Sequence, residues 1–343
     1  MVVIFVSIAT GCKNGTQTTL DRPQYLGPYR NSTSDQKGLL RSWPEKGPEV
    51  LWTVNVGIGY GGPVINDGKV YLLDRNGEAG DIMRCFNFSN GKELWSFSYD
   101  APGTVQFPGS RSVPTLDGNY IYSCSQNGDL YCIDIRTHKP VWNKNIWTDY
   151  GGERLPNWEC HIPVPSAVDA GEGRVLVAAG YELGTVMLKV EKKTDGSYGV
   201  TELFRHNDFG DQTKPPVMHN GYFYAQFSTN SKKDGLACMN MNGKVLWKTQ
   251  RKPGFDKGSM ILADGLILAT DGSKTLYLID PDTTGFKPLA SAELLGEGGA
   301  GSENDPVASK VGGTTQNWGP LALADGRLLI RDQNRMMCVR VVK

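Results

Sequence analysis

The chain has 343 residues, enough for one large all-β domain or two smaller ones. Its 36 basic and 36 acidic residues balance, which argues against nucleic-acid binding because that function needs a basic surface. The four histidines lack the spacing of zinc ligands, so no metal site is predicted.

The N-terminus begins with a short apolar run that is followed by small residues and Cys12. This pattern resembles a bacterial lipoprotein signal, which is cleaved at the cysteine and lipidated there. Ala9 stands where leucine is usual, and no Lys or Arg precedes the run, so an ordinary exported N-terminus is the alternative. We expect a signal segment over residues 1–12, lipidation at Cys12 and a polar tether over residues 13–47.

One phrase returns along the rest of the chain. Residues 67–95 contain DGKVYLLD and MRCFNFSNGKELW, residues 117–142 contain DGNYIYSC and LYCIDIRTHKPVW, and residues 220–247 contain NGYFYAQF and LACMNMNGKVLW. Each copy has a turn, two alternating apolar runs, a second turn and a Trp. A strand-built period of roughly 40 to 50 residues is typical of the blades of a β-propeller.

Aligning the copies gives six repeats. They cover residues 61–100, 112–149, 163–208, 215–251, 258–295 and 318–343, and the last is one strand short. Residues 48–57 read as a closing strand without the strands that should precede it, with Trp52 in the closing position. We therefore predict one propeller of six four-stranded antiparallel blades over residues 48–343, closed by the N-terminal strand joining the C-terminal blade. Seven or eight blades are the alternative.

Within a blade, residues 70–73 are predicted as the inner strand, apolar on both faces because blades pack on both sides. Asn-Gly and Gly-Lys pairs supply the positive φ angles that two-residue hairpins need. The closing Trp is expected to pack between neighbouring blades. Phe204 takes its place in the third repeat, and Leu289 lies near it in the fifth.

Cysteine occurs at one repeated position, although an exported protein with seven cysteines suggests disulfides. This position holds Cys85, Cys132, Cys238, Cys338, Met187 and Leu278 in the six copies. A place that is shared by Cys, Met and Leu is a small apolar core position. We expect buried, reduced thiols there, whereas Cys124 and Cys160 have no assigned role.

At these residues the sequence resembles the PQQ-like β-propeller repeat family, whose blades carry an apolar strand ending near Asp, a Thr-Gly-Lys turn and a Trp. The resemblance covers roughly residues 23–343. It implies two classes of function. Quinoprotein dehydrogenases bind pyrroloquinoline quinone and calcium in eight-bladed propellers, and assembly lipoproteins resembling the outer-membrane factor BamB use the blades for protein contacts.

A quinoprotein site needs a carboxylate base and several oxygen ligands for calcium. The family's catalytic members also carry adjacent cysteines, which this chain lacks. Glu303, Asn304 and Asp305 offer oxygen ligands, but the family takes its calcium ligands from separate blades. No cofactor is therefore predicted, with pyrroloquinoline quinone and calcium as the less favoured alternative.

The residues that precede each inner strand surround one mouth of the propeller channel. These candidate ligand-binding residues are Tyr60, Arg111, Trp158, His161, Lys214, Lys257, Asn317 and Trp318. The cations could pair with carboxylate or phosphate, and the Trp faces could stack on rings. The alternative is that these side chains only seal and solvate the channel. Two long connections, residues 146–163 and 295–319, end at this mouth.

Nucleophile and phosphate-loop motifs are absent from the sequence, and no catalytic residue is assigned. We therefore predict a monomeric propeller of the bacterial cell envelope, lipid-anchored to the outer membrane or periplasmic. Its predicted role is a non-catalytic binding or scaffold module for a protein partner or an anionic or carbohydrate ligand. The alternative is a PQQ-like oxidoreductase or another enzyme that acts on a sugar or alcohol at the mouth.

Overall fold

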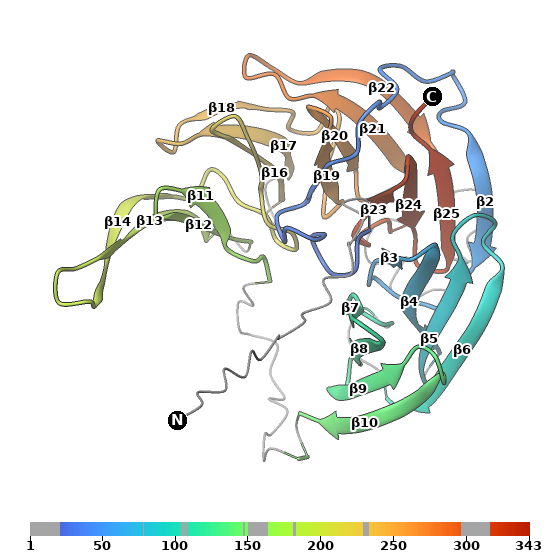
Figure 1. The fold of residues 1–343 in the computed structure, drawn as a ribbon. Helices are drawn as coiled ribbons and strands as arrows, with labels where there is room; N and C mark the ends of the chain where they lie inside the picture. Colours follow the sequence, from blue (N-terminus) through green and yellow to red (C-terminus); the bar gives the residue numbers. More distant parts are fainter. Residues whose placement is uncertain are drawn as a thin grey trace, which may run out of the picture.

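The computed structural model describes residues 21–77, 79–103, 107, 109–146, 148–149, 164–180, 183–228, 233–295 and 316–343. These residues form six antiparallel sheets arranged around a common centre (Figure 1). The fold is a six-bladed β-propeller, as the sequence predicts. Within the described ranges there is no helix with the length and apolar character that crossing a membrane requires.

The first three blades follow one another along the chain. Blade 1 contains β3 (Val64–Asn66), β4 (Lys69–Asn76), β5 (Gly80–Asn87) and β6 (Glu93–Asp100). Blade 2 contains β7 (Thr115–Asp117), β8 (Tyr120–Cys124), β9 (Asp129–Asp134) and β10 (Lys139–Asn145). Blade 3 contains β11 (Val168–Gly171), β12 (Arg174–Ala179), β13 (Gly184–Lys192) and β14 (Tyr198–His206).

The last three blades include both strands from the N-terminal region. Blade 4 contains β15 (Val217–His219), β16 (Tyr222–Ser228), β17 (Lys233–Asn240) and β18 (Val245–Lys248). Blade 5 contains β19 (Met260–Ala263), β20 (Leu266–Thr270), β21 (Thr275–Asp280) and β22 (Lys287–Glu293), with β1 (Thr33–Ser34) added in parallel beside β19. Blade 6 contains β23 (Ala322–Ala324), β24 (Arg327–Arg331), β25 (Arg335–Arg340) and β2 (Val50–Asn55).

The N-terminal strand completes the C-terminal blade. β2 pairs antiparallel with β25, and Trp52 lies opposite Cys338, which confirms the predicted closure of that blade. The prediction of the inner strand in blade 1 is wrong. The short strand β3 lies innermost and β4 is second, because the first apolar run after the mouth is only three residues long.

The hairpin between the first two strands of a blade turns on paired positive φ angles. In blade 1 these are Asp67 (φ 49°) and Gly68 (φ 66°), and blade 4 repeats the turn with Asn220 and Gly221. A two-residue loop with both φ angles positive matches the right-handed twist of the strands that it joins. The predicted hairpin turns are confirmed.

Each blade has the same register across its three long strands. In blade 1, Tyr71 lies opposite Cys85, which lies opposite Trp95, with a β-bulge just before the Trp. The same bulge precedes the closing residue of every blade, so in blade 5 the closing position is Ala290, directly after the predicted Leu289. The bulge turns the closing side chain toward the next blade.

The repeated cysteines are free thiols inside the blades. All four are at most 2% exposed, and Met187 and Leu278 are equally buried in the other two blades. Burial raises the pKa of the Cys85 thiol to about 11 and that of Cys338 to about 12. A thiol that is protonated and inaccessible is a small apolar side chain, so the core position predicted from the sequence is confirmed.

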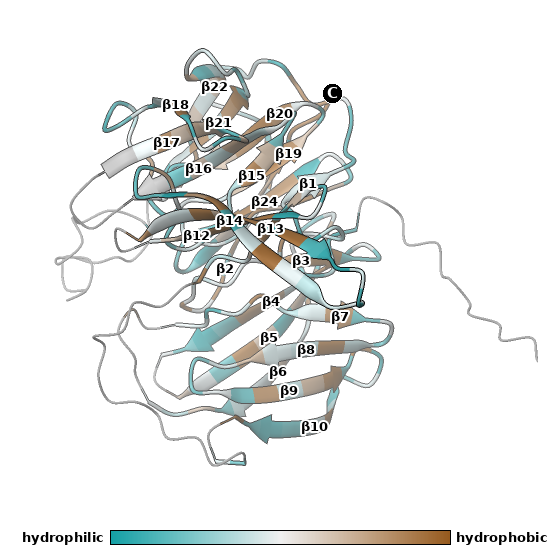
Figure 2. Ribbon diagram, turned by 90° about the vertical axis from the view of Figure 1, so that its left-hand side faces the viewer, coloured by the Kyte–Doolittle hydropathy of each residue, from teal (hydrophilic) through white to brown (hydrophobic). Residues whose placement is uncertain are grey.

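Apolar clusters fill five of the interfaces between blades. They join blade 1 with blade 2, blade 3 with 4, blade 4 with 5, blade 5 with 6, and blade 6 with 1. The closing aromatics take part, since Trp52 donates from Nε1 to the carbonyl of Phe88 in the next blade at 3.0 Å, and Trp95 stacks on His138 at 4.6 Å. Figure 2 shows the hydrophobic residues running through the strands.

The structure differs from the sequence expectation at the N-terminal segment. Residues 21–47, assigned to a tether, lie against the blades instead of leading away from them (Figure 1, dark blue). Residues 22–34 pair with inner strands, and Leu39 pairs with Val342 just beyond β25. Arg22 exchanges two backbone hydrogen bonds with Ile65 on β3, and β1 pairs with β19. The polar composition misled the prediction, because the backbone pairs with strand edges and needs no apolar run. Residues 1–20, including Cys12, lie outside the described residues.

Replacement of Trp247 by alanine is expected to lower the free energy of unfolding by about 3 kcal/mol. The indole is half-buried between Tyr224 and Phe286, and its Nε1 donates to the carbonyl of Asp282 in blade 5 at 3.0 Å. Urea titration followed by circular dichroism measures the change. Trp247→Phe keeps most of the packing and should cost about 1 kcal/mol. Equal losses in the two variants would contradict the assigned packing.

Candidate functional site

Trp318 is the centre of a side-chain cluster at the mouth of the channel. It lies in the connection that enters blade 6, and its ring stacks on Tyr60 with centroids 5.4 Å apart. Phe107 contacts the same indole at 5.7 Å, and the ammonium of Lys257 lies 5.0 Å from the ring centroid. The cluster therefore contains side chains from the connections that enter blades 1, 2, 5 and 6.

Two lysines from neighbouring blades point into this cluster. Lys214, which precedes β15, donates from Nζ to the carbonyl of Trp318 at 2.9 Å. Lys257, which precedes β19, pairs with Asp256 at 2.9 Å. Burial lowers the pKa of Lys214 to about 8, and the charge of Lys257 adds to this shift. Because the two ammonium groups repel each other and are partly shielded from water, binding of a negatively charged group between them is favoured.

Asp211 lies beneath Lys214 and is fully buried. Its Oδ1 accepts hydrogen bonds from the backbone N–H groups of Thr213 and Lys214 at 2.9 and 3.0 Å, whereas Oδ2 has no hydrogen-bond partner among the described residues. Burial raises the pKa of Asp211 to about 6. The carboxylate fixes the turn that carries Lys214, and it only partly offsets the positive charge of the two lysines.

A polar network holds Tyr60 in place. Its hydroxyl donates to Oε1 of Gln316 at 2.7 Å and accepts from Nε2 of Gln333 at 3.3 Å. Gln333 comes from the turn between β24 and β25. The sequence analysis missed Gln316, Gln333, Phe107 and Asp211, because it considered only the residues directly before each inner strand. The turns between the second and third strands of each blade also border this mouth. The register of the repeats would have identified these turns, and with them Gln333.

The structure brings together Tyr60, Lys214, Lys257 and Trp318 from the predicted set. Arg111 is exposed beside them and donates from Nη2 to the carbonyl of Phe107 at 2.8 Å. Asn317 is buried, and its side-chain oxygen has no partner among the described residues. Trp158 and His161 lie outside the described residues, as do Glu303, Asn304 and Asp305. Ligand binding by any of these residues stays a prediction.

The donor set at the mouth suits an anion better than a calcium ion. Calcium takes six to eight oxygen ligands, several of them carboxylates. In the described part of the chain, no three His, Cys, Asp or Glu side chains are placed to hold a metal. Asp256 is paired with a lysine and Asp211 is buried under another, so the described residues do not fit calcium.

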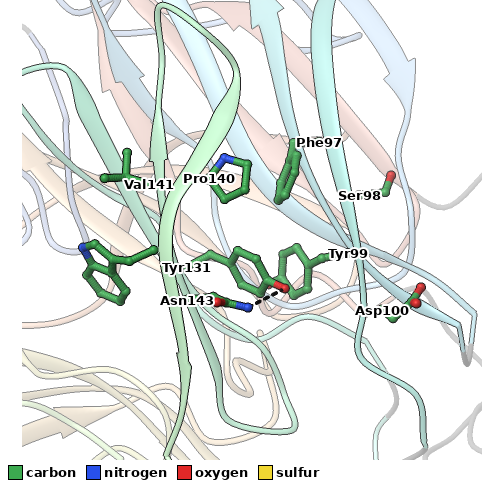
Figure 3. A pocket seen from close by; sticks show the side chains of 9 residues that line it. Phe97, Ser98, Tyr99, Asp100, Tyr131, Pro140, Val141 and Asn143 are labelled. Carbon is green, nitrogen blue, oxygen red and sulfur yellow. Dashed lines mark hydrogen bonds between the residues drawn. The ribbon is translucent and has the colours of Figure 1, made fainter.

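A hollow lies on the outer rim between β6 and β10, away from the mouth (Figure 3). Its volume is about 520 Å³. Tyr99 and Tyr131 stack at 4.0 Å in its wall, and the amide of Asn143 donates to the hydroxyl of Tyr131 at 3.3 Å. It is open, and its lining contains the carboxylate of Asp100 but no lysine or arginine, so the mouth is the better candidate site for an anion.

Comparison with known proteins found a family model and solved structures that match this chain. The family model described as "Outer membrane protein assembly factor BamB" matches residues 30–200. A solved structure that matches is the crystal structure of BamB from Moraxella catarrhalis, with 12% sequence identity over 84% of this chain and 83% of that chain and a TM-score of 0.35. Among curated proteins there is no match.

Proposed function

We propose, from the premise that this chain belongs to the PQQ-like β-propeller repeat family, that it is a non-catalytic binding module whose channel mouth takes an anionic group. The observation that carries this proposal is the convergence of Lys214 and Lys257 on Trp318. A carboxylate or phosphate between the two amines would make charge-assisted hydrogen bonds to both. The stacked rings of Trp318 and Tyr60 would cover the body of the ligand.

A protein partner is the ligand class that the family favours. The matching family model is named for an assembly factor of outer-membrane proteins, and we extend a scaffold role and a place in the bacterial envelope to this chain as part of the proposal. An acidic side chain or a C-terminal carboxylate of a partner would present the anion. Lipidation at Cys12 stays a prediction within the same proposal.

Calorimetric titration measures whether the mouth binds anions. Citrate and inorganic phosphate are the probes, and neutral maltotriose is the uncharged comparison. We expect the two anions to bind, and Lys214→Met, Lys257→Met and Trp318→Ala each to weaken binding about tenfold or more. Lys92→Met, which removes an exposed lysine from a distant turn, is the matched control and should bind like the wild type. Binding that is absent, or equal in all variants, would contradict the proposal.

The same titration should depend on pH in one direction. Lys214 is protonated below about pH 8, and Asp211 becomes charged above about pH 6. Raising the pH from 6 to 9 therefore adds negative charge and then removes positive charge beside the ligand. Citrate gains its own last negative charge at the lower end of this range, so the comparison is made between pH 7 and 9. The affinity for citrate should fall there, and the fall above pH 8 should disappear in Lys214→Met.

A further inference from the structure

The hollow on the outer rim between β6 and β10 has an aromatic floor. Phe97 of β6 contacts Tyr131 of β9 with ring centroids 5.8 Å apart, and Tyr99 stacks on Tyr131 at 4.0 Å. Figure 3 shows the three rings side by side between the two blades. Phe97 and Tyr131 are only half-buried, whereas Tyr99 is 7% exposed. Ring surface of Phe97 and Tyr131 is therefore accessible to a molecule in the hollow.

A polar pair borders this floor. Asn143 of β10 is exposed, and its amide donates to the hydroxyl of Tyr131 at 3.3 Å. The amide keeps a second N–H group and its oxygen, and the hydroxyl keeps its own hydrogen, so the pair offers donors and acceptors to a ligand. Tyr99 does not extend the pair, because its hydroxyl lies 3.5 Å from the buried carboxylate of Asp81 inside blade 1.

The charge of the hollow favours a neutral ligand. Among the described residues its lining includes Asp100 and no lysine, arginine or histidine. A carboxylate or phosphate would meet a negative group there without a cation to offset it. Figure 3 shows the side chain of Asp100 turned away from the three rings, so it does not select a cation over them either.

Two extended strands form the walls of the hollow. Residues 97–100 of β6 lie on one side and residues 140–143 of β10 on the other. Four residues of a strand span about 13 Å, at about 3.3 Å per residue. The hollow has a volume of about 520 Å³ and is open to solvent. Its shape suits an elongated ligand that extends beyond the walls.

The corresponding place in blade 5 is filled by the chain itself. Tyr277 corresponds to Tyr131, and Ser291 faces Tyr277 where Asn143 faces Tyr131. Phe255, from the connection that enters blade 5, packs on Tyr277 at 5.0 Å and is 1% exposed. In its described part, the connection that enters blade 2 makes no such ring contact with Tyr131. Tyr131 therefore keeps accessible surface where Phe255 covers its counterpart.

We propose that this hollow is a second binding site, which takes a neutral oligosaccharide of β-linked pyranose rings. A pyranose whose hydroxyls are all equatorial presents axial C–H groups on its faces, and such a face packs on aromatic rings. The hydroxyls at its edge donate and accept, which matches the amide of Asn143 and the hydroxyl of Tyr131. Apolar surface with a few placed polar groups is typical of sites for small ligands. Because β-links keep the chain extended, neighbouring rings would follow the walls.

Saturation-transfer NMR on the full chain tests the site with cellotriose as the probe. We expect transfer mainly to the axial C–H protons of the sugar, because these would face the rings. Asn143→Ala should weaken binding about fivefold to tenfold, and Phe97→Leu about fivefold, because each removes one half of the site. Tyr198→Leu, which removes an exposed tyrosine from blade 3, is the matched control and should bind like the wild type.

Two additions keep the test decisive. If Phe97→Leu does not fold, Tyr131→Phe replaces it. This variant removes only a hydroxyl and should weaken binding about threefold or more. The mouth variant Lys214→Met should bind cellotriose like the wild type, since the hollow uses none of the mouth residues. Failure of anion binding at the mouth would therefore leave the cellotriose result unchanged.

Three results would overturn the proposal. The first is the absence of transfer to cellotriose, or equal binding by the wild type and Asn143→Ala. The second is binding that is lost in Lys214→Met and kept in Asn143→Ala, because it would assign the sugar to the mouth. The third comes from hexaproline as a second probe. If hexaproline binds in a manner that depends on Asn143 and cellotriose does not, the hollow is a peptide groove.

Discussion

A chain that ends before Met337 is expected to lose its single cooperative unfolding transition. The deletion of residues 337–343 removes most of β25, which is the only link between β24 and the N-terminal strand β2 in the described sheet. Without it, Trp52 loses its facing Cys338, and the clusters on both sides of blade 6 lose apolar side chains that are at most 7% exposed. A blade that lacks its third strand cannot pack against its two neighbours. The faces of blades 5 and 1 that contact blade 6 would then be exposed to solvent.

Differential scanning calorimetry measures this effect. The full chain should give one transition, whereas the truncated chain should give a broad, weak signal or none. A chain that lacks only the exposed Lys343 is the matched control and should melt like the full chain. A truncated protein with an unchanged transition would show that β2 does not depend on β25, and the closure of blade 6 would then be incorrectly assigned.

Replacement of Asp81 by alanine is expected to destabilise the protein by about 3 to 5 kcal/mol. Asp81 pairs with Arg75 at 2.8 Å inside blade 1, and neither side chain is more than 1% exposed. Arg75 also donates to the carbonyls of Ala101 and Gly103, so its guanidinium holds the start of the connection from blade 1 to blade 2 by hydrogen bonds. Removing the carboxylate leaves this cation buried without its counter-ion.

The double variant Arg75→Met with Asp81→Leu separates the two possible causes. Burial raises the pKa of Asp81 even beside the arginine, which indicates that the ion pair does not recover the full cost of taking the carboxylate out of water. The double variant should therefore unfold close to the wild type, within about 1 to 2 kcal/mol, in urea titrations. A double variant as unstable as Asp81→Ala would mean that the site depends on polar contacts to the chain at Ala101 rather than on charge compensation.

Most of the fold could be predicted because a propeller repeats one local pattern. The alternation of each blade, the Gly-containing turns and the shared position of Cys85 and Met187 are all visible within about 40 residues. The same pattern showed that the sixth repeat, residues 318–343, lacks one strand and that residues 48–57 supply an extra closing strand. The failures occurred where pairing does not depend on apolar alternation: β3 is too short to recognise, and residues 21–47 pair through their backbone.

The candidate site was predictable only as a list of positions. Residues before the inner strands must surround the mouth, which identified Lys214, Lys257 and Trp318. The sequence could not show that Trp318 lies under one lysine and against another, nor that Gln333 would fix Tyr60 from a turn 273 residues away. Those contacts depend on the radius of the ring and on how far each connection rises above its blade.

The sequence by itself therefore determined the number of blades, their internal register and the strand that completes the last one, because each of these follows from local periodicity and from counting strands. Only the tertiary structure decided which mouth side chains converge, how the N-terminal segment lies against the ring, and which seam between blades is left without an apolar cluster in the described residues. Such features arise between elements that are distant in the chain, where no periodic pattern relates one side chain to the other.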